Sequence, residues 1–85
     1  MSNNGKNPLE YLTTEEAIAE FPYPAKLYEW TTRKLRTIAE MGFIKHKYDN
    51  NIKRFVFRRG SIVKSLRYIL KNGESNNDDL RNAIE

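Results

Sequence analysis

Apolar residues recur with a helical period between Pro24 and Met41. Successive residues of a helix are rotated by about 100°, so the residues of this stretch separate onto two sides. The apolar side consists of Leu27, Thr31, Leu35, Ile38 and Met41, with Trp30 at its edge. The opposite side consists of Tyr28, Glu29, Thr32, Arg33, Arg36 and Glu40. The pattern predicts one amphipathic helix over residues 24–41, ended by Gly42, which takes a left-handed cap conformation without steric cost.

Two runs of strand-forming residues follow this helix directly. Residues 43–48 and 52–57 are separated by Asp49, Asn50 and Asn51, short polar residues that favour tight turns. The pattern predicts a two-stranded β-hairpin. Its alternation places Phe55 and Phe57 together on the face turned toward the core.

Helical patterns also lie on both sides of this central region. Thr13 or Thr14 can cap a short helix whose buried side consists of Ala17, Ile18 and Phe21. Pro22 and Pro24 end that helix. After the hairpin, a helix beginning near Ser61 would bury Ile62, Leu66, Ile69 and Leu70.

The order of these elements indicates the fold class. A short strand or extended lead, a short helix, the corner FPYP, a longer helix, a hairpin and a closing helix form an α+β domain with about three helices. This is the plan of a winged helix-turn-helix, in which the hairpin is the wing. A chain of 85 residues is the size of one such domain.

The domain is expected to span residues 10–72. Residues 1–9 are polar and Asn-rich, and they predict a disordered lead-in. Residues 73–85 are acidic and predict either disorder or a short helix around Leu80 and Ile84. A further interpretation is that Leu80 and Ile84 dock on a second subunit.

The charge is unevenly distributed along the chain. The net charge is +4, but the stretch from Lys26 to Lys64 holds eleven Lys and Arg against three acidic residues, while both ends are acidic. A basic middle of this kind predicts a polyanionic partner. The alternative interpretation is that these residues only keep a small domain in solution.

Several functional classes are not expected from the composition. The chain has no cysteine, and His46 is its only histidine, so neither a metal site nor another cofactor site is predicted. No acid, base and nucleophile come together in a motif, and no enzyme activity is expected. No apolar run reaches the roughly 20 residues of a membrane span, and the start has no signal-peptide pattern, so a cytoplasmic, intracellular protein is predicted.

Three fragments of the chain resemble small DNA-binding proteins of the excisionase and MerR-like winged helix-turn-helix group. They are YLTTEEA at residues 11–17, LYEW at residues 27–30 and RFVFRRGSI at residues 54–62. A fourth fragment, TTRKLRTIAEMGFI at residues 31–44, is similar to the recognition helix and wing entry of MarR- and PadR-type repressors. The first resemblance implies a recombination-directionality or transcription factor of a mobile element. The second implies a dimeric repressor.

Both resemblances imply binding to double-stranded DNA, with helix 24–41 in the major groove and wing 43–57 on the backbone. In the resemblance, Thr32, Arg33 and Arg36 match the exposed side of a recognition helix. Lys53 and Arg54 match wing contacts, and Arg58 and Arg59 match basic residues at the wing exit. The basic and aromatic pattern adds Lys26 and Tyr28 near the helix start and Lys45 and Lys47 on the wing.

Self-association on DNA follows from the same resemblances, as side-by-side copies in the first case and as a dimer in the second. No small-molecule ligand is expected, because no ligand-binding domain follows the winged helix. The alternative function is a winged-helix interaction adaptor that binds an acidic partner through the same basic surface.

Overall fold

The computed structural model describes residues 6–73 and 76–84 of the chain. Within them lie five helices and a three-stranded antiparallel sheet, so the α+β class is confirmed. The elements in chain order are β1 (Tyr11–Leu12), α1 (Thr14–Glu20), α2 (Pro22–Leu27), α3 (Thr32–Glu40), β2 (His46–Asp49), β3 (Arg54–Arg58), α4 (Arg59–Asn72) and α5 (Asp78–Ile84).

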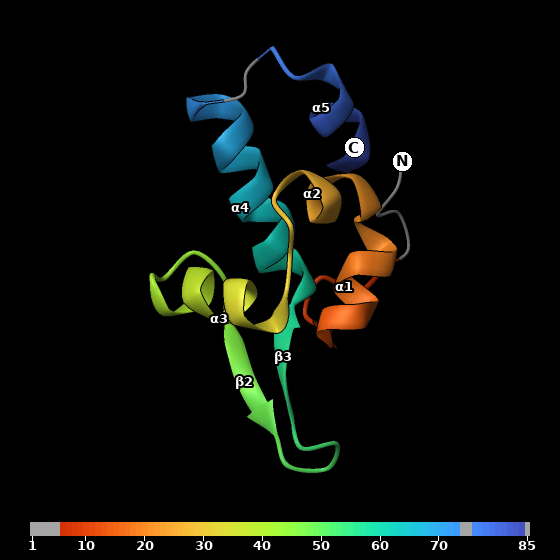
Figure 1. Cartoon of the computed structure of the whole chain (residues 1–85), viewed down its shortest axis with the longest axis vertical. Coiled ribbons are helices and arrows are strands. Elements are labelled where there is room, and N and C mark those ends of the chain that lie inside the picture. Colours follow the sequence, from red (N-terminus) through yellow and green to blue (C-terminus); the bar gives the residue numbers. More distant parts are fainter. Residues whose placement is uncertain (1–5, 74–75, 85) are drawn as a thin grey trace.

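The sheet has the order β1-β3-β2, with β3 in the centre. His46 lies opposite Phe57 and Asp49 lies opposite Arg54, so the predicted hairpin is confirmed. On the other edge of β3, Tyr11 lies opposite Arg58. The free part of the hairpin extends beyond the helices along the longest axis of the molecule (Figure 1).

The first and last of the predicted helices are present, with small differences in their bounds. Thr13 caps α1 through a capping box, in which its hydroxyl accepts a hydrogen bond from Glu16 N and the Glu16 carboxylate accepts one from Thr13 N. The closing helix α4 begins at Arg59, two residues before the expected Ser61, and follows β3 without a loop.

The single helix predicted over residues 24–41 is wrong, because the chain breaks between Leu27 and Thr32. Glu29 has a φ of 54°, a left-handed conformation that is uncommon for a residue with a Cβ. This turn directs Trp30 into the core, where its ring meets Phe21 edge-on at a centroid distance of 6.4 Å. Thr31 is extended and caps the new helix by accepting a hydrogen bond from Lys34 N at 3.1 Å. The corner FPYP bends at Phe21, which separates α1 from α2, and both of its prolines lie in the first turn of α2.

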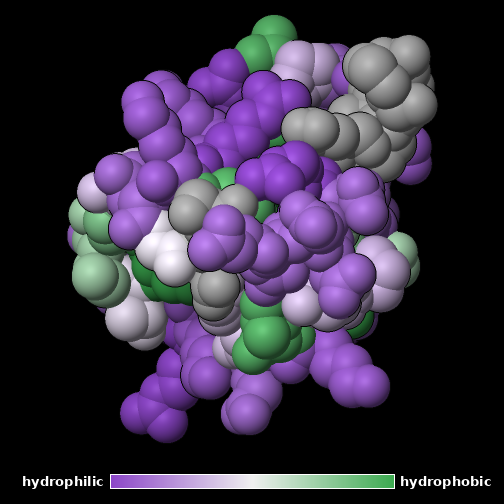
Figure 2. Space-filling model, turned by 90° about the horizontal axis from the view of Figure 1, so that it is seen from above, coloured by the Kyte–Doolittle hydropathy of each residue, from purple (hydrophilic) through white to green (hydrophobic). Residues whose placement is uncertain are grey.

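The break changes which apolar side chains are buried. Leu35 is fully buried, as expected, but Leu27 and Met41 are exposed. Ile18, expected in the core, is also partly exposed on α1. The largest fully buried side chains are Phe21, Pro24, Leu35, Phe57, Ile62, Leu66, Leu80 and Ile84. Seen from above, most of the visible surface is hydrophilic, with separate hydrophobic patches (Figure 2).

The two ends of the described chain pack on the domain. Gly60 N donates to the carbonyl of Pro8 at 2.8 Å, so disorder is a wrong prediction for residues 6–9, while residues 1–5 lie outside the described part. Leu80 and Ile84 are buried against the chain's own helices, and α5 contacts α2 and α4. The interpretation that these two residues dock on a second subunit is therefore wrong. None of the described helices is both long and apolar enough to cross a membrane.

Candidate nucleic-acid interface

The outer side of α3 is the first part of the candidate interface. Because α3 begins at Thr32, helical spacing places Arg33, Thr37 and Glu40 on the side turned away from Leu35 and the core. All three are exposed. Thr37 donates its hydroxyl hydrogen to Arg33 O at 3.0 Å, which leaves its methyl group and its oxygen lone pairs available to an incoming ligand. Within the described ranges, no carboxylate pairs with Arg33.

Thr32 and Arg36 hold α3 in place as well as facing the surface. The hydroxyls of Thr32 and Thr14 lie 2.7 Å apart, which ties the start of α3 to the start of α1. The guanidinium carbon of Arg36 lies 4.1 Å from the centroid of Phe55, and one of its terminal nitrogens lies 3.7 Å from the Glu40 carboxylate. Arg36 lies on the polar side of α3, as predicted, but its side chain is only partly exposed.

The contact between Arg36 and Phe55 couples α3 to the hairpin. A guanidinium over an aromatic face is attracted by the ring quadrupole, by about 0.5–2 kcal/mol depending on its exposure. The Nε of Arg36 is buried and has no hydrogen-bond partner among the described residues. This side chain therefore fixes the angle between α3 and β3.

The hairpin has two chemically different faces. Cross-strand pairing places His46, Tyr48, Phe55 and Phe57 on one face, which is the face that Arg36 covers. His46 stacks on both phenylalanine rings, with centroids 5.9 Å from Phe55 and 6.2 Å from Phe57. The ring of His46 is therefore half-buried against the two phenylalanines.

The other face of the hairpin is basic. It carries Lys47, Arg54 and Arg58, with Asp49 opposite Arg54 in the register. Lys47 extends over the ring of Tyr11, with its ammonium 4.6 Å from the centroid. Arg54 reaches back to the helices and forms an ion pair with Glu15 at 2.9 Å. Arg54 is therefore partly neutralised, although both side chains are more than half exposed.

Two further lysines flank the hairpin without an ion-pair partner in the part of the chain that the structure describes. Lys45 is exposed just before β2, and Lys53 is exposed in the turn. Lys53 has a φ of 56°, a conformation that turns the chain sharply back into β3. The carboxylate of Asp49 stabilises the same turn by accepting a hydrogen bond from Asn51 N at 2.9 Å.

A cleft of about 410 Å³ separates the hairpin from the starts of α1 and α3. Its walls include Thr14, Thr32, Tyr48, Lys53 and Phe55, and the ion pair of Glu15 with Arg54 bridges it. Polar groups of α3 and basic groups of the hairpin thus meet across one depression.

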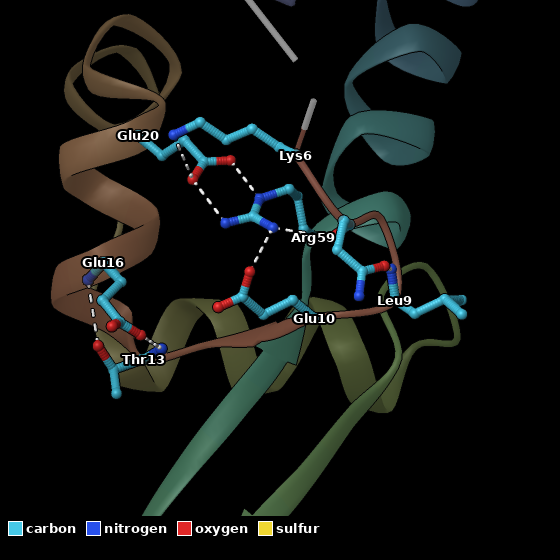
Figure 3. A network of polar contacts seen from close by, with 8 residues as sticks. Lys6, Leu9, Glu10, Thr13, Glu16, Glu20 and Arg59 are labelled. Carbon is cyan, nitrogen blue, oxygen red and sulfur yellow. Dashed lines mark hydrogen bonds and ion pairs between the residues drawn. The ribbon is translucent and has the colours of Figure 1, made fainter. Parts of the chain in front are cut away.

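Arg59 is not part of this surface, and its prediction as a DNA contact is wrong. Its side chain is only 7% exposed and makes two hydrogen bonds to the Glu20 carboxylate, at 2.6 and 2.9 Å. A further nitrogen donates to Glu10 Oε1 and to the carbonyl of Asn7, both at 2.7 Å (Figure 3). Arg59 therefore joins the start of α4 to the end of α1 and to the segment before β1.

The charges of this cluster shift the ionisation of its members. Hydrogen bonds to Glu20 outweigh the effect of burial and raise the pKa of Arg59. Burial by itself raises the pKa of Glu20, but the hydrogen bonds and positive charges of Arg59 and Lys6 outweigh it, and the net pKa is lowered. Lys6 contributes from 3.6 Å. Both groups are thus held in their charged forms.

Lys26 and Tyr28 do not belong to the recognition helix. Lys26 is exposed in the last turn of α2, and Tyr28 follows at the C-cap of that helix. Tyr28 is half-buried and packs against the core. The signal that could have revealed this division is Thr31, a favoured N-cap residue that is followed by a helical period of its own.

In the structure Lys34 lies on the exposed flank of α3, where its ammonium donates to the carbonyl of Tyr28 at 3.2 Å and lies 3.9 Å from Glu29.

Within the described ranges, no group of three or more His, Asp or Glu could hold a metal ion. No protein-family model, curated protein or solved structure matches this chain.

Proposed function

We propose that this protein is a winged helix-turn-helix that binds double-stranded DNA. In this arrangement α2 and α3 form the helix-turn-helix, α3 enters the major groove, and β2–β3 is the wing along the phosphate backbone. The observation that carries the proposal is a set of exposed cations on α3 and the hairpin, Arg33, Lys45, Lys47 and Lys53, none of which pairs with a carboxylate within residues 6–73 and 76–84.

The residues have different parts in this proposal. Arg33 and Thr37 lie one turn apart on the outer side of α3, where an arginine fork can donate to the O6 and N7 of guanine and a threonine methyl can contact thymine. Lys45, Lys47 and Lys53 supply phosphate contacts, which give affinity without sequence preference. Thr32 and Arg36 act as positioning residues, because their contacts with Thr14 and Phe55 set the angle of α3.

The biological role within this proposal is that of a transcriptional regulator or a recombination-directionality factor of a mobile element. These roles follow from the fragments that resemble excisionase and MerR-like proteins and from the α3 sequence that resembles repressors. The two roles differ in geometry. Side-by-side copies would protect directly repeated sites, whereas a dimer would protect inverted half-sites about one helical turn apart.

The proposal is tested by fluorescence anisotropy with duplex DNA at several salt concentrations. Each phosphate contact contributes a slope of about 0.9 in log affinity against log salt. The double variant Lys45→Ala with Lys53→Ala should lower affinity for all sequences and reduce the slope by up to about 1.8. The matched control, Lys26→Ala with Lys71→Ala, removes the same charge from α2 and from the end of α4 and should leave the slope nearly unchanged.

Base reading is tested separately on a sequence selected from a random pool. Arg33→Ala should lower affinity for the selected site about tenfold more than for random DNA, a loss of about 1.4 kcal/mol that lies within the roughly 1–3 kcal/mol of a bidentate contact. If the wild-type chain protects no DNA sequence even at low salt, the DNA proposal is wrong. That result would favour the adaptor that binds an acidic protein.

A further inference from the structure

An apolar groove lies on the side of α3 that is turned away from the hairpin. It has a volume of about 270 Å³, and its walls come from α3, the loop after α3, and α4. Ile38 of α3 lines the groove, whereas Arg36 contacts the hairpin, and helical spacing places these two residues on opposite sides of α3. The groove and the proposed DNA surface are therefore separate.

The groove is open to solvent although its lining is almost entirely apolar. Met41 is 66% exposed, Phe43 is 46% exposed and Tyr68 is 54% exposed. The rings of Phe43 and Tyr68 meet across the groove with centroids 6.0 Å apart. Hydrophobic residues are visible on the side of the molecule where α3 and its following loop lie (Figures 1 and 2). Clustered exposed apolar side chains of this kind mark interaction sites.

The rim of the groove is mainly basic. Lys64 and Lys71 lie on the same stripe of α4 as Tyr68, about one turn on either side of it. Lys34 lies beside Ile38 on α3. Glu29 offsets part of this charge, because its carboxylate lies 3.9 Å from the Lys34 ammonium. The charge of the rim therefore favours an acidic occupant.

A second copy of this chain is poorly suited to fill the groove. The apolar side of α5 is already buried through Leu80 and Ile84. The large apolar residues exposed outside the groove are Leu9, Ile18, Leu27, Tyr48 and Ile52, and no two of them share a helix. No described helix thus presents the two or more anchors, three or four residues apart, that helix-in-groove docking needs.

We propose that this groove binds an amphipathic, acidic α-helix of another protein. Apolar side chains of that helix would pack between Ile38, Met41, Phe43 and Tyr68, and its carboxylates would face Lys34, Lys64 and Lys71. The docking site goes beyond DNA binding, because it uses the opposite flank of α3. It would let a bound partner protein and DNA occupy the domain together.

Trp30 provides a direct readout, since it is the only tryptophan in the chain and it lines the groove. The probe is a synthetic 15-residue helix of Leu and Glu with Leu at positions i, i+3, i+4 and i+7. The comparison probe carries Lys in place of every Glu. Titration of the full chain with the acidic helix should shift Trp30 emission to saturation, with an affinity at least tenfold higher than that for the basic helix.

Variants separate the groove from the rest of the molecule. Phe43→Ser and Met41→Glu should each weaken the acidic helix at least tenfold, while Leu9→Ser, which removes an equally exposed apolar side chain elsewhere, should not. Lys64→Glu with Lys71→Glu should abolish the preference for the acidic helix. Circular dichroism checks that each variant remains folded. Phe43→Ser should bind duplex DNA within twofold of the wild type, which keeps this result independent of the DNA proposal.

Three outcomes would overturn the proposal. Equal binding of the acidic and basic helices, or no response of Trp30 to either, would mean that the lysine rim selects no acidic helix. A dimer of the chain in sedimentation experiments that Phe43→Ser abolishes would mean that the groove is an interface between two copies.

Discussion

Replacement of Arg59 should destabilise the domain more than replacement of any other charged residue in the described structure. Its guanidinium is almost completely buried and makes four hydrogen bonds, to Glu20, Glu10 and Asn7. Removing one partner of a buried ion pair leaves an uncompensated charge, which costs about 3–5 kcal/mol. For Arg59→Ala we expect the low end of this range, because the Glu20 side chain is 13% exposed and still has a second cation, Lys6, at 3.6 Å. A domain of this size has a total stability of about 5–15 kcal/mol, so about 3 kcal/mol is a large part of it.

The contacts of Arg59 also predict the order of the smaller effects. Glu20→Gln keeps an acceptor for one Arg59 nitrogen but loses the charge, and should cost about 1–2 kcal/mol. Glu10→Gln should cost less than about 1 kcal/mol, because Glu10 is 56% exposed and its pair with Arg59 is screened on that side. The double variant Arg59→Met with Glu20→Leu should recover much of the loss, since no buried charge then remains unpaired.

The measurement is urea unfolding followed by circular dichroism. The unfolding midpoints of the variants and the wild type are compared at a constant dependence of the free energy on urea concentration. The pH dependence adds an independent check. Because the folded-state pKa of Glu20 lies below its ordinary value of 4.5, its contribution to stability is present above that pH and is lost as the pH falls through the folded pKa. The free energy of unfolding of Glu20→Gln should therefore lie furthest below that of the wild type at neutral pH, and the two values should converge at acidic pH. A cost for Arg59→Ala no larger than that for Glu10→Gln would refute the reasoning.

Three further variants test the packing of α3 and α4. Leu35→Ala should lower the free energy of unfolding by about 2–5 kcal/mol, because Leu35 is fully buried. Ile38→Ala should lower it less, because Ile38 lines an open groove. Equal shifts in melting temperature for the two variants would contradict this assignment. Thr31→Ala should cost about 0.5–2 kcal/mol through loss of the N-cap of α3, and Thr31→Asn should retain most of that stability in the same melts. Gly60→Ala should lower the melting temperature, because the new Cβ would lie 2.9 Å from the carbonyl oxygen of Pro8. A melting temperature equal to that of the wild type would show that the segment before β1 is not held against α4.

Local patterns in the sequence were sufficient to predict several parts of the fold. The capping residues before α1, the turn residues between β2 and β3, and the apolar period of α4 each depend on neighbours within a few positions. Their physical causes are the orphan groups of a helix end, the short polar side chains that favour a tight turn and the spacing of one helix face. The positive φ of the turn lies at Lys53, which the pattern placed in the second strand. The basic character of residues 26–64 is likewise a property of the sequence itself.

The break between α2 and α3 was not predictable in this way, because the apolar period continues across it. Burial of Trp30 against Phe21 requires a turn at Glu29, and a periodic pattern does not contain that contact. The break determines that Arg33 and Thr37 face outward, that Lys26 and Tyr28 belong elsewhere, and that Met41 borders a groove.

The sequence by itself determined the class of the elements, their order and the sign of the charge around them. Only the tertiary structure decided the fate of individual side chains. Arg58 and Arg59 are neighbours with the same chemistry, yet Arg58 lies on the basic face of the hairpin while Arg59 is buried against residues 39 to 52 positions earlier in the chain. Leu80 and Ile84 likewise complete the core rather than a dimer. The reason is that local periodicity specifies which face of an element is apolar, whereas the partner of that face is chosen by contacts between segments distant in sequence.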